Sequence, residues 1–181
     1  MKPRLRTSLL VLFVGVTLAA IAQEFCPPLT ALRLKPPLLL GVATYYAMRR
    51  ETGWAVAAAV WCGLLEDALG FVPCGVSPLA FGACLLAARF AVRPQVPEGA
   101  AACALVGGAA APIVAFAQYF AMRLCGAPGV PLFFLAARLL ALAPFGAAAA
   151  GLCAAALRGL DWLSVNVEPE EDDDESLDWC A

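Results

Sequence analysis

The chain has 181 residues, of which 62 % are hydrophobic and 14 % are charged, whereas a soluble domain is about half apolar and a quarter charged. This excess predicts a membrane protein with several spans, and the length leaves no room for a large soluble domain as well. The absence of histidine excludes His-based zinc sites and Ser-His-Asp triads. The net charge is −2, and the few exposed cations argue against a nucleic-acid-binding surface.

Six apolar runs, separated by Pro- and Gly-containing joints, predict six transmembrane helices over about residues 7–25, 36–48, 53–71, 75–92, 100–122 and 131–157. A basic stretch precedes the first run, and Ala20-Ile21-Ala22 resembles a signal-peptidase site. Because further apolar runs follow, an uncleaved first span is favoured over a cleaved signal. The second run is short, and losing it would reverse the orientation of everything after it.

Lysine and arginine in the short loops predict the orientation, since cytoplasmic loops carry more of them. With the N-terminus inside, the inner face collects Lys2, Arg4, Arg6, Arg49, Arg50, Arg93 and Arg158, and the outer face collects Arg33, Lys35 and Arg123. Seven against three favours both chain ends in the cytoplasm. We therefore expect an all-α compact six-helix bundle over residues 1–162.

The composition of the spans and of the C-terminal end adds three expectations. Alanine and glycine are frequent in the spans, and small residues let helix backbones approach closely in lipid. Residues 163–181 form an acidic tail that we expect to be disordered in the cytoplasm. Cys26, Cys74 and Cys125 map near the outer face, where a Cys26–Cys74 disulfide is one option and free thiols are the simpler one.

Glu66 and Asp67 are adjacent carboxylates in the middle of an apolar run. An acid inside a membrane is costly, so it normally faces the bundle or water and has a partner. Adjacent helical residues point about 100° apart, so we expect one acid to pair internally and the other to reach the outer rim. Arg138 lies at a similar depth, which suggests an Asp67–Arg138 ion pair between the third and sixth spans. Arg89 is interpreted as a snorkelling residue at a helix end.

The stretch from about residue 33 to 92 resembles the MreD family of rod shape-determining membrane proteins. In this family an aromatic pair closes the second span and a G-x-x-x-D segment follows. Tyr45-Tyr46 stands for that pair, and Gly63 with Asp67 matches the segment. Gly75 and Leu79 match the glycine and leucine after the next loop. Val72-Pro73-Cys74, the extra acid Glu66 and the acidic tail depart from the family pattern.

The resemblance implies a non-catalytic scaffold of the cell-wall elongation complex that contributes to cell shape and peptidoglycan synthesis. It also implies a multi-pass protein of the bacterial cytoplasmic (inner) membrane. The implied partners are a single-span MreC-like protein, MreB filaments, and a RodA-type glycosyltransferase with its transpeptidase. No cofactor and no metal are expected. Asp67, Glu66, Arg138, Gly63 and Gly75 are the candidate structural or partner-binding residues.

Two other functions stay open. The bundle is also similar to the substrate-binding subunit of an energy-coupling-factor vitamin transporter, in which Glu66, Asp67, Gln118, Arg123 and Arg138 would line a polar cavity near the outer face. An intramembrane enzyme is disfavoured, because no nucleophile with a base and no set of metal ligands is visible.

Overall fold

The computed structural model describes residues 3–26, 35–92 and 99–165. In these ranges the chain forms six helices and no strand, which confirms the all-helical prediction. The helices are α1 (Pro3–Phe25), α2 (Leu38–Arg49), α3 (Thr52–Gly70), α4 (Val76–Val92), α5 (Ala100–Leu124) and α6 (Leu132–Val165). The predicted starts and ends agree within a few residues, except that α6 runs on past the predicted end at residue 157. Residues 166–181, most of the acidic tail, lie outside the described part.

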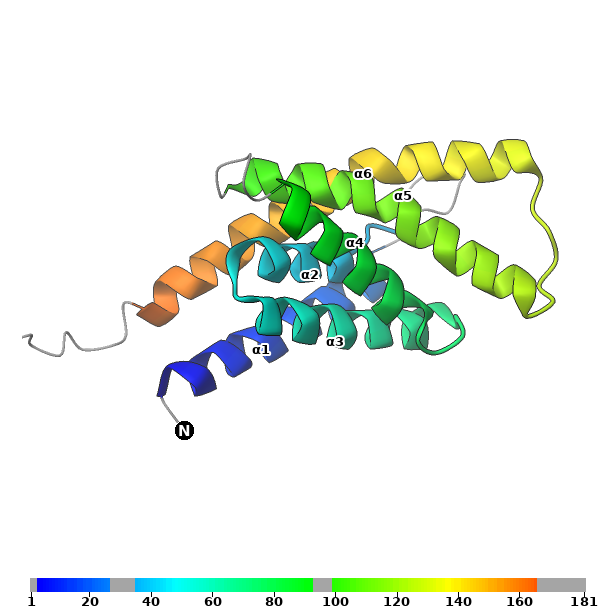
Figure 1. Cartoon of the computed structure of the whole chain (residues 1–181). Coiled ribbons are helices and arrows are strands. Elements are labelled where there is room, and N and C mark those ends of the chain that lie inside the picture. The colour runs from blue at the N-terminus through cyan, green and yellow to red at the C-terminus, as the bar shows by residue number, and fades with distance from the viewer. Residues whose placement is uncertain (1–2, 27–34, 93–98, 166–181) are drawn as a thin grey trace, which may run out of the picture.

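The short helix α2 lies at the centre of the bundle (Figure 1). Ten consecutive residues, Leu39 to Met48, are buried. A helix that is apolar all round has no solvent face and belongs in a core. The other five helices pack around α2, and each of them exposes large apolar side chains on the outside of the bundle.

Small residues set the contact between α5 and α6. A side-chain carbon added at Gly107 would lie 2.3 Å from Cβ of Ala150, and one added at Gly146 would lie 2.5 Å from Cβ of Ala111. Both distances are far shorter than a van der Waals contact, so only glycine fits at either position. This agrees with the expected close approach of helix backbones. α6 contains Pro144, and its yellow and orange halves run in different directions in Figure 1, as expected when proline removes a helical hydrogen bond.

The helices alternate in direction, so the bundle has two distinct ends. At one end, here called the Asp67 end, α1, α3 and α5 finish and α2, α4 and α6 begin. At the opposite, Asp161 end, Asp161 accepts hydrogen bonds from the Tyr45 hydroxyl at 2.5 Å and from the Arg50 guanidinium at 2.8 Å. The N-terminal helix begins and α6 finishes on the same side in Figure 1, as an even number of alternating helices requires.

Arg89 differs from its prediction as a snorkelling residue. Its guanidinium is buried and donates hydrogen bonds to the backbone carbonyls of Ala47, at 2.8 Å, and Arg50. The last carbonyls of a helix have no intrahelical partner, and a cation there also favours the helix dipole. Arg89 of α4 therefore caps the C-terminus of α2.

Two helices in the described ranges are long and apolar enough to cross a membrane, namely α5 and the part of α6 from Leu132 to Trp162. Shorter apolar helices cover Leu9–Phe25 and Val76–Ala91. At about 1.5 Å per residue, α2 is roughly 18 Å long, well below the ~30 Å of a hydrocarbon core. Residues 3–26, 35–92 and 99–165 thus contain two helices that are long and apolar enough to cross a membrane, whereas six spans were expected.

Candidate functional site

The Asp67 carboxylate closes the turn between α3 and α4. Asp67 is buried near the end of α3, and its two oxygens accept hydrogen bonds from the backbone N–H of Gly75 at 2.7 Å and of Ser77 at 3.1 Å. The first N–H groups of a helix have no intrahelical partner, and an anion there interacts favourably with the helix dipole. Asp67 therefore caps the N-terminus of α4 from the preceding helix. Its own backbone carbonyl accepts from Val72 at 3.1 Å and so helps to end α3.

The turn requires glycine at two positions. Gly63 lies one turn before Asp67 on the same face of α3, and a side-chain carbon there would lie 2.4 Å from the backbone nitrogen of Pro78. Gly75 has a φ of +103°, a conformation that residues with a Cβ rarely adopt. Gly63 and Asp67, which match the G-x-x-x-D segment, and Gly75, which matches the following loop glycine, thus belong to one structural unit, here called the Asp67 turn. Leu79, the last matched residue, is 76 % exposed.

The expected Asp67–Arg138 ion pair is not formed. Both Asp67 oxygens are taken by backbone N–H groups, and no ion pair joins Asp67 to Arg138 among the described residues. Depth along the helices had suggested the pair. The N–H groups of the following loop lie nearer in sequence and compete for the same carboxylate.

Glu66 pairs inside the bundle and does not reach the outer rim. Its carboxylate accepts a hydrogen bond from the side-chain amide of Gln23 at 2.8 Å. The other end of the Gln23 amide accepts from the backbone N–H of Leu39 at 3.2 Å. Gln23, at 5 % exposure, therefore joins α1, α2 and α3, and it caps the N-terminus of α2, which follows a proline that offers no capping side chain.

Beside this contact lies a cavity of about 760 Å³ at the Asp67 end, here called the polar cavity. It is lined by parts of all six helices and by the connection from α5 to α6. Its polar wall combines Gln23, Glu24, Glu66, Gln118 and Tyr119 with the cations Lys35, Arg123 and Arg138. Its volume lies within the range of about 300–1,000 Å³ typical of small-molecule sites.

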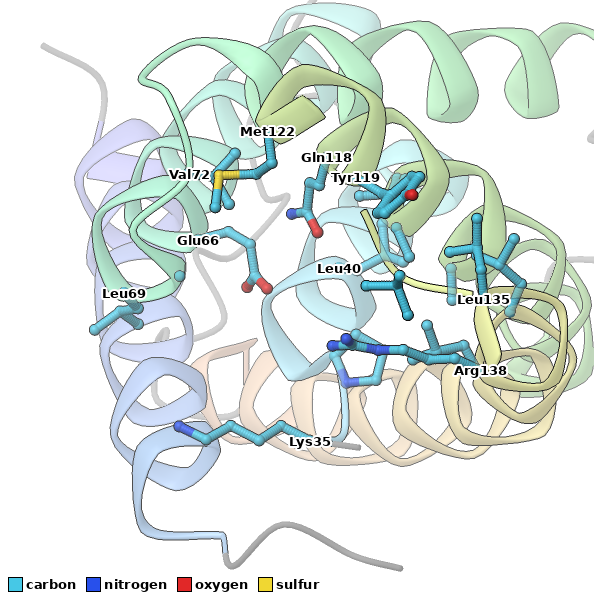
Figure 2. Close-up of a pocket in the computed structure, with 18 of the residues that line it drawn as sticks. Lys35, Leu40, Glu66, Leu69, Val72, Gln118, Tyr119, Met122, Leu135 and Arg138 are labelled. Atoms are coloured by element: carbon cyan, nitrogen blue, oxygen red, sulfur yellow. The ribbon is translucent and has the colours of Figure 1, made fainter. Parts of the chain in front are cut away.

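Figure 2 shows Glu66, Gln118 and Arg138 directed into the same space from three different helices. Gln118 of α5 also donates a hydrogen bond to the Ser77 hydroxyl at 2.8 Å, and Ser77 is fully buried at the start of α4. The hydrogen bond from Gln118, which lines the polar cavity, to Ser77, whose backbone N–H is bound by Asp67, therefore connects the cavity to the Asp67 turn. Asp67 does not line the cavity, whereas Glu66, Gln118, Arg123 and Arg138 do, as the transporter-subunit alternative anticipated.

The cysteines and acids offer no further site. All seven cysteines in the described ranges are free, so the Cys26–Cys74 disulfide is not formed, and Cys180 lies outside those ranges. No group of three Cys, Asp or Glu side chains that could hold a metal ion occurs within residues 3–26, 35–92 and 99–165.

Sequence reasoning missed Gln23 and Asp161. Gln23 carries a weak signal, since it is the first amide after a long apolar run and precedes Glu24. Asp161 lies three residues after Arg158, and nothing in that spacing points to Tyr45, which is 116 residues away.

Comparisons with protein-family models, with curated proteins and with solved structures find no match. Functional inference for this chain therefore depends on its geometry and on its sequence resemblance.

Proposed function

We propose that this chain is a multi-pass protein of the bacterial cytoplasmic membrane and a non-catalytic scaffold of the cell-wall elongation complex, as an MreD-like protein would be. In this proposal all six helices lie within the bilayer, with the Asp67 end outside and both chain ends in the cytoplasm. The partners are a single-span MreC-like protein, MreB filaments and a RodA-type glycosyltransferase with its transpeptidase.

The observation that carries the proposal is the Asp67 turn. Gly63, Asp67 and Gly75 were matched to the family by sequence pattern alone. In the structure all three are needed for the same turn, because Gly63 allows the close approach of α4, Asp67 binds the N–H of Gly75, and Gly75 adopts a positive φ. A chance match between apolar sequences has no reason to select three residues that depend on one another. Cys74 in the loop and Leu79 in the first turns of α4 are both exposed near this turn in sequence, and we propose that they provide a surface for a partner helix.

The apolar surface supports a location in lipid. Large side chains such as Leu10, Phe90, Leu105, Phe133 and Leu152, from four helices, are each more than 60 % exposed. A soluble monomer rarely exposes contiguous apolar patches of more than a few hundred Å². In a bilayer these side chains would contact acyl chains.

The orientation is tested with two natural cysteines. Cys74 and Cys125 are exposed at the Asp67 end. We expect a membrane-impermeant maleimide to label both in intact cells. A cysteine introduced by Glu51→Cys, at the exposed start of α3, should react only after permeabilisation. Labelling of Cys74 and Cys125 from opposite sides would refute the six-span arrangement.

The partnership is tested by co-purification and by deletion. We expect the tagged chain to capture an MreC-like protein co-expressed with it, and a Leu79→Arg variant to lose that capture while remaining folded. A Leu140→Arg variant, which places the same charge on α6 at similar exposure, serves as the control. Unchanged rod shape after deletion of the gene from a rod-shaped host would count against the proposal.

The polar cavity favours a second candidate, the substrate-binding subunit of an energy-coupling-factor vitamin transporter. Such a subunit needs an enclosed polar site near the outer face, and the cavity has suitable volume and donors. Native mass spectrometry of the purified chain would show a tightly bound vitamin if this function is correct. A bound vitamin together with unchanged cell shape after deletion would favour the transporter subunit over the scaffold.

A further inference from the structure

The polar cavity contains hydrogen-bonding groups that the fold leaves unused. Every fully buried side-chain nitrogen or oxygen atom in the described ranges has a hydrogen-bond partner. Glu66 uses one carboxylate oxygen for Gln23, and Gln118 uses only its amide nitrogen, for Ser77. The second Glu66 oxygen and the Gln118 carbonyl are two acceptors without a donor among the described residues, and both side chains line the cavity.

Arg138 is the unused donor of the same cavity. The other two cations on its wall have partners, since Lys35 forms an ion pair with Glu24 at 3.1 Å and Arg123 donates to the Ala127 carbonyl at 2.7 Å. Arg138 has no hydrogen bond or ion pair within residues 3–26, 35–92 and 99–165. The side chain of Arg138 is exposed and lines the cavity, so its guanidinium is available to an anionic ligand.

The unused groups have opposite character and lie on different helices. Glu66 on α3 offers negative charge, while Arg138 on α6 offers positive charge with several donors (Figure 2). The Glu66 carboxylate and the Arg138 guanidinium do not form an ion pair with each other, so a ligand can lie between them. The rest of the wall is largely apolar and includes Leu40, Phe81 and Leu139.

We propose that the polar cavity binds a small zwitterion with an apolar body, whose protonated amine contacts Glu66 and Gln118 and whose anionic group contacts Arg138. An amine donates to both acceptors, and a carboxylate or phosphate accepts from a guanidinium in two parallel hydrogen bonds. The same chemistry occurs in a soluble amino acid or dipeptide and in the headgroup of phosphatidylethanolamine. The inference needs only the cavity and does not depend on either function proposed above.

The experiment uses the full chain in nanodiscs of phosphatidylglycerol and the dipeptide leucyl-leucine as the probe, with binding measured by calorimetry. We expect saturable binding, and binding weakened about tenfold or more for N-acetyl-leucyl-leucine, which lacks the amine, and for leucyl-leucine amide, which lacks the carboxylate. Glu66→Gln keeps a group that can accept from Gln23, and Arg138→Gln removes the cation. Each should weaken binding of the dipeptide by a similar factor. Arg158→Gln, exposed farther along the same helix, should not change it.

Glu66→Gln gives the sharpest readout, because it should weaken leucyl-leucine binding while leaving binding of the N-acetyl analogue unchanged. A general loss of folding would weaken both. In a parallel arm, native mass spectrometry compares retention of phosphatidylethanolamine and phosphatidylglycerol. Preferential retention of phosphatidylethanolamine that both variants abolish would identify the lipid headgroup as the source of the zwitterion. The proposal is overturned if neither probe binds, or if binding is indifferent to both variants.

Discussion

Replacement of Asp67 by alanine should destabilise the folded chain strongly. The substitution removes both hydrogen bonds that hold the N-terminus of α4, to Gly75 at 2.7 Å and to Ser77 at 3.1 Å. A hydrogen bond to a charged group contributes about 1.5–3 kcal/mol, and a buried N–H left without a partner costs about 1–3 kcal/mol. We therefore expect a loss of about 3 kcal/mol in the free energy of unfolding, which is more than the roughly 1 kcal/mol typical of an exposed N-cap.

Asp67→Asn separates the hydrogen bonds from the charge. The amide keeps one acceptor oxygen but places an NH₂ group against the second N–H. We therefore expect Asp67→Asn to lower the free energy of unfolding by ~1.5 kcal/mol, about half of the loss expected for alanine. The free energy is measured by reversible unfolding in mixed detergent micelles, and hydrogen exchange should show faster exchange at Gly75 and Ser77. Glu51→Ala is the matched control, because Glu51 occupies the N-cap position of α3 without a capping side-chain hydrogen bond. The capping role is refuted if Asp67→Ala costs no more than Glu51→Ala, or if Asn is as costly as Ala.

Three further substitutions are read by the same unfolding assay. Gly63→Ala should cost about 1–3 kcal/mol, since the new methyl group meets the Pro78 backbone, whereas Gly53→Ala has open space and should be neutral or stabilising; equal effects would refute the close approach. Arg89→Met should cost about 2 kcal/mol by leaving the last carbonyls of α2 without a donor, and an unchanged stability would argue against the cap. Asp161→Asn should cost less than about 1 kcal/mol because its ion pair is only partly buried, and a larger loss would show a coupled network.

The helices were predictable because their boundaries are local. Proline and glycine stand at the joints, such as Pro36-Pro37 before α2 and Gly126 to Gly129 before α6, and these residues end or start helices through their own backbone chemistry. The number of helices that cross the bilayer is harder to predict, because it depends on how the helices pack against one another. Hydropathy counts apolar residues, and α2 is apolar because five helices surround it.

The partners of the charged residues were harder to predict. Depth along a helix gives one coordinate, and it suggested Arg138 for Asp67. The missing coordinate is the direction around the helix axis. Spacing supplied part of that coordinate, because Gly63 and Asp67 are four residues apart and so share a face of α3. A small residue and a capping residue on one face, just before a short loop, indicate a helix that turns back tightly.

Arg89 was misread for a related reason. Near the end of a helix an arginine can reach water or a neighbouring carbonyl, and its position in the sequence is the same in both cases. Only the placement of the C-terminus of α2 beside α4 distinguishes the two.

The burial of α2 has a consequence for synthesis. Gln23, which caps the first N–H groups of α2, is synthesised before α2. Arg89, which caps its last carbonyls, is synthesised 42 residues after Ala47, and Asp161, which binds Tyr45, is synthesised later still. The centre of the molecule therefore closes only when nearly the whole chain has left the ribosome, and truncated chains that stop before α6 should be substrates for quality-control proteases.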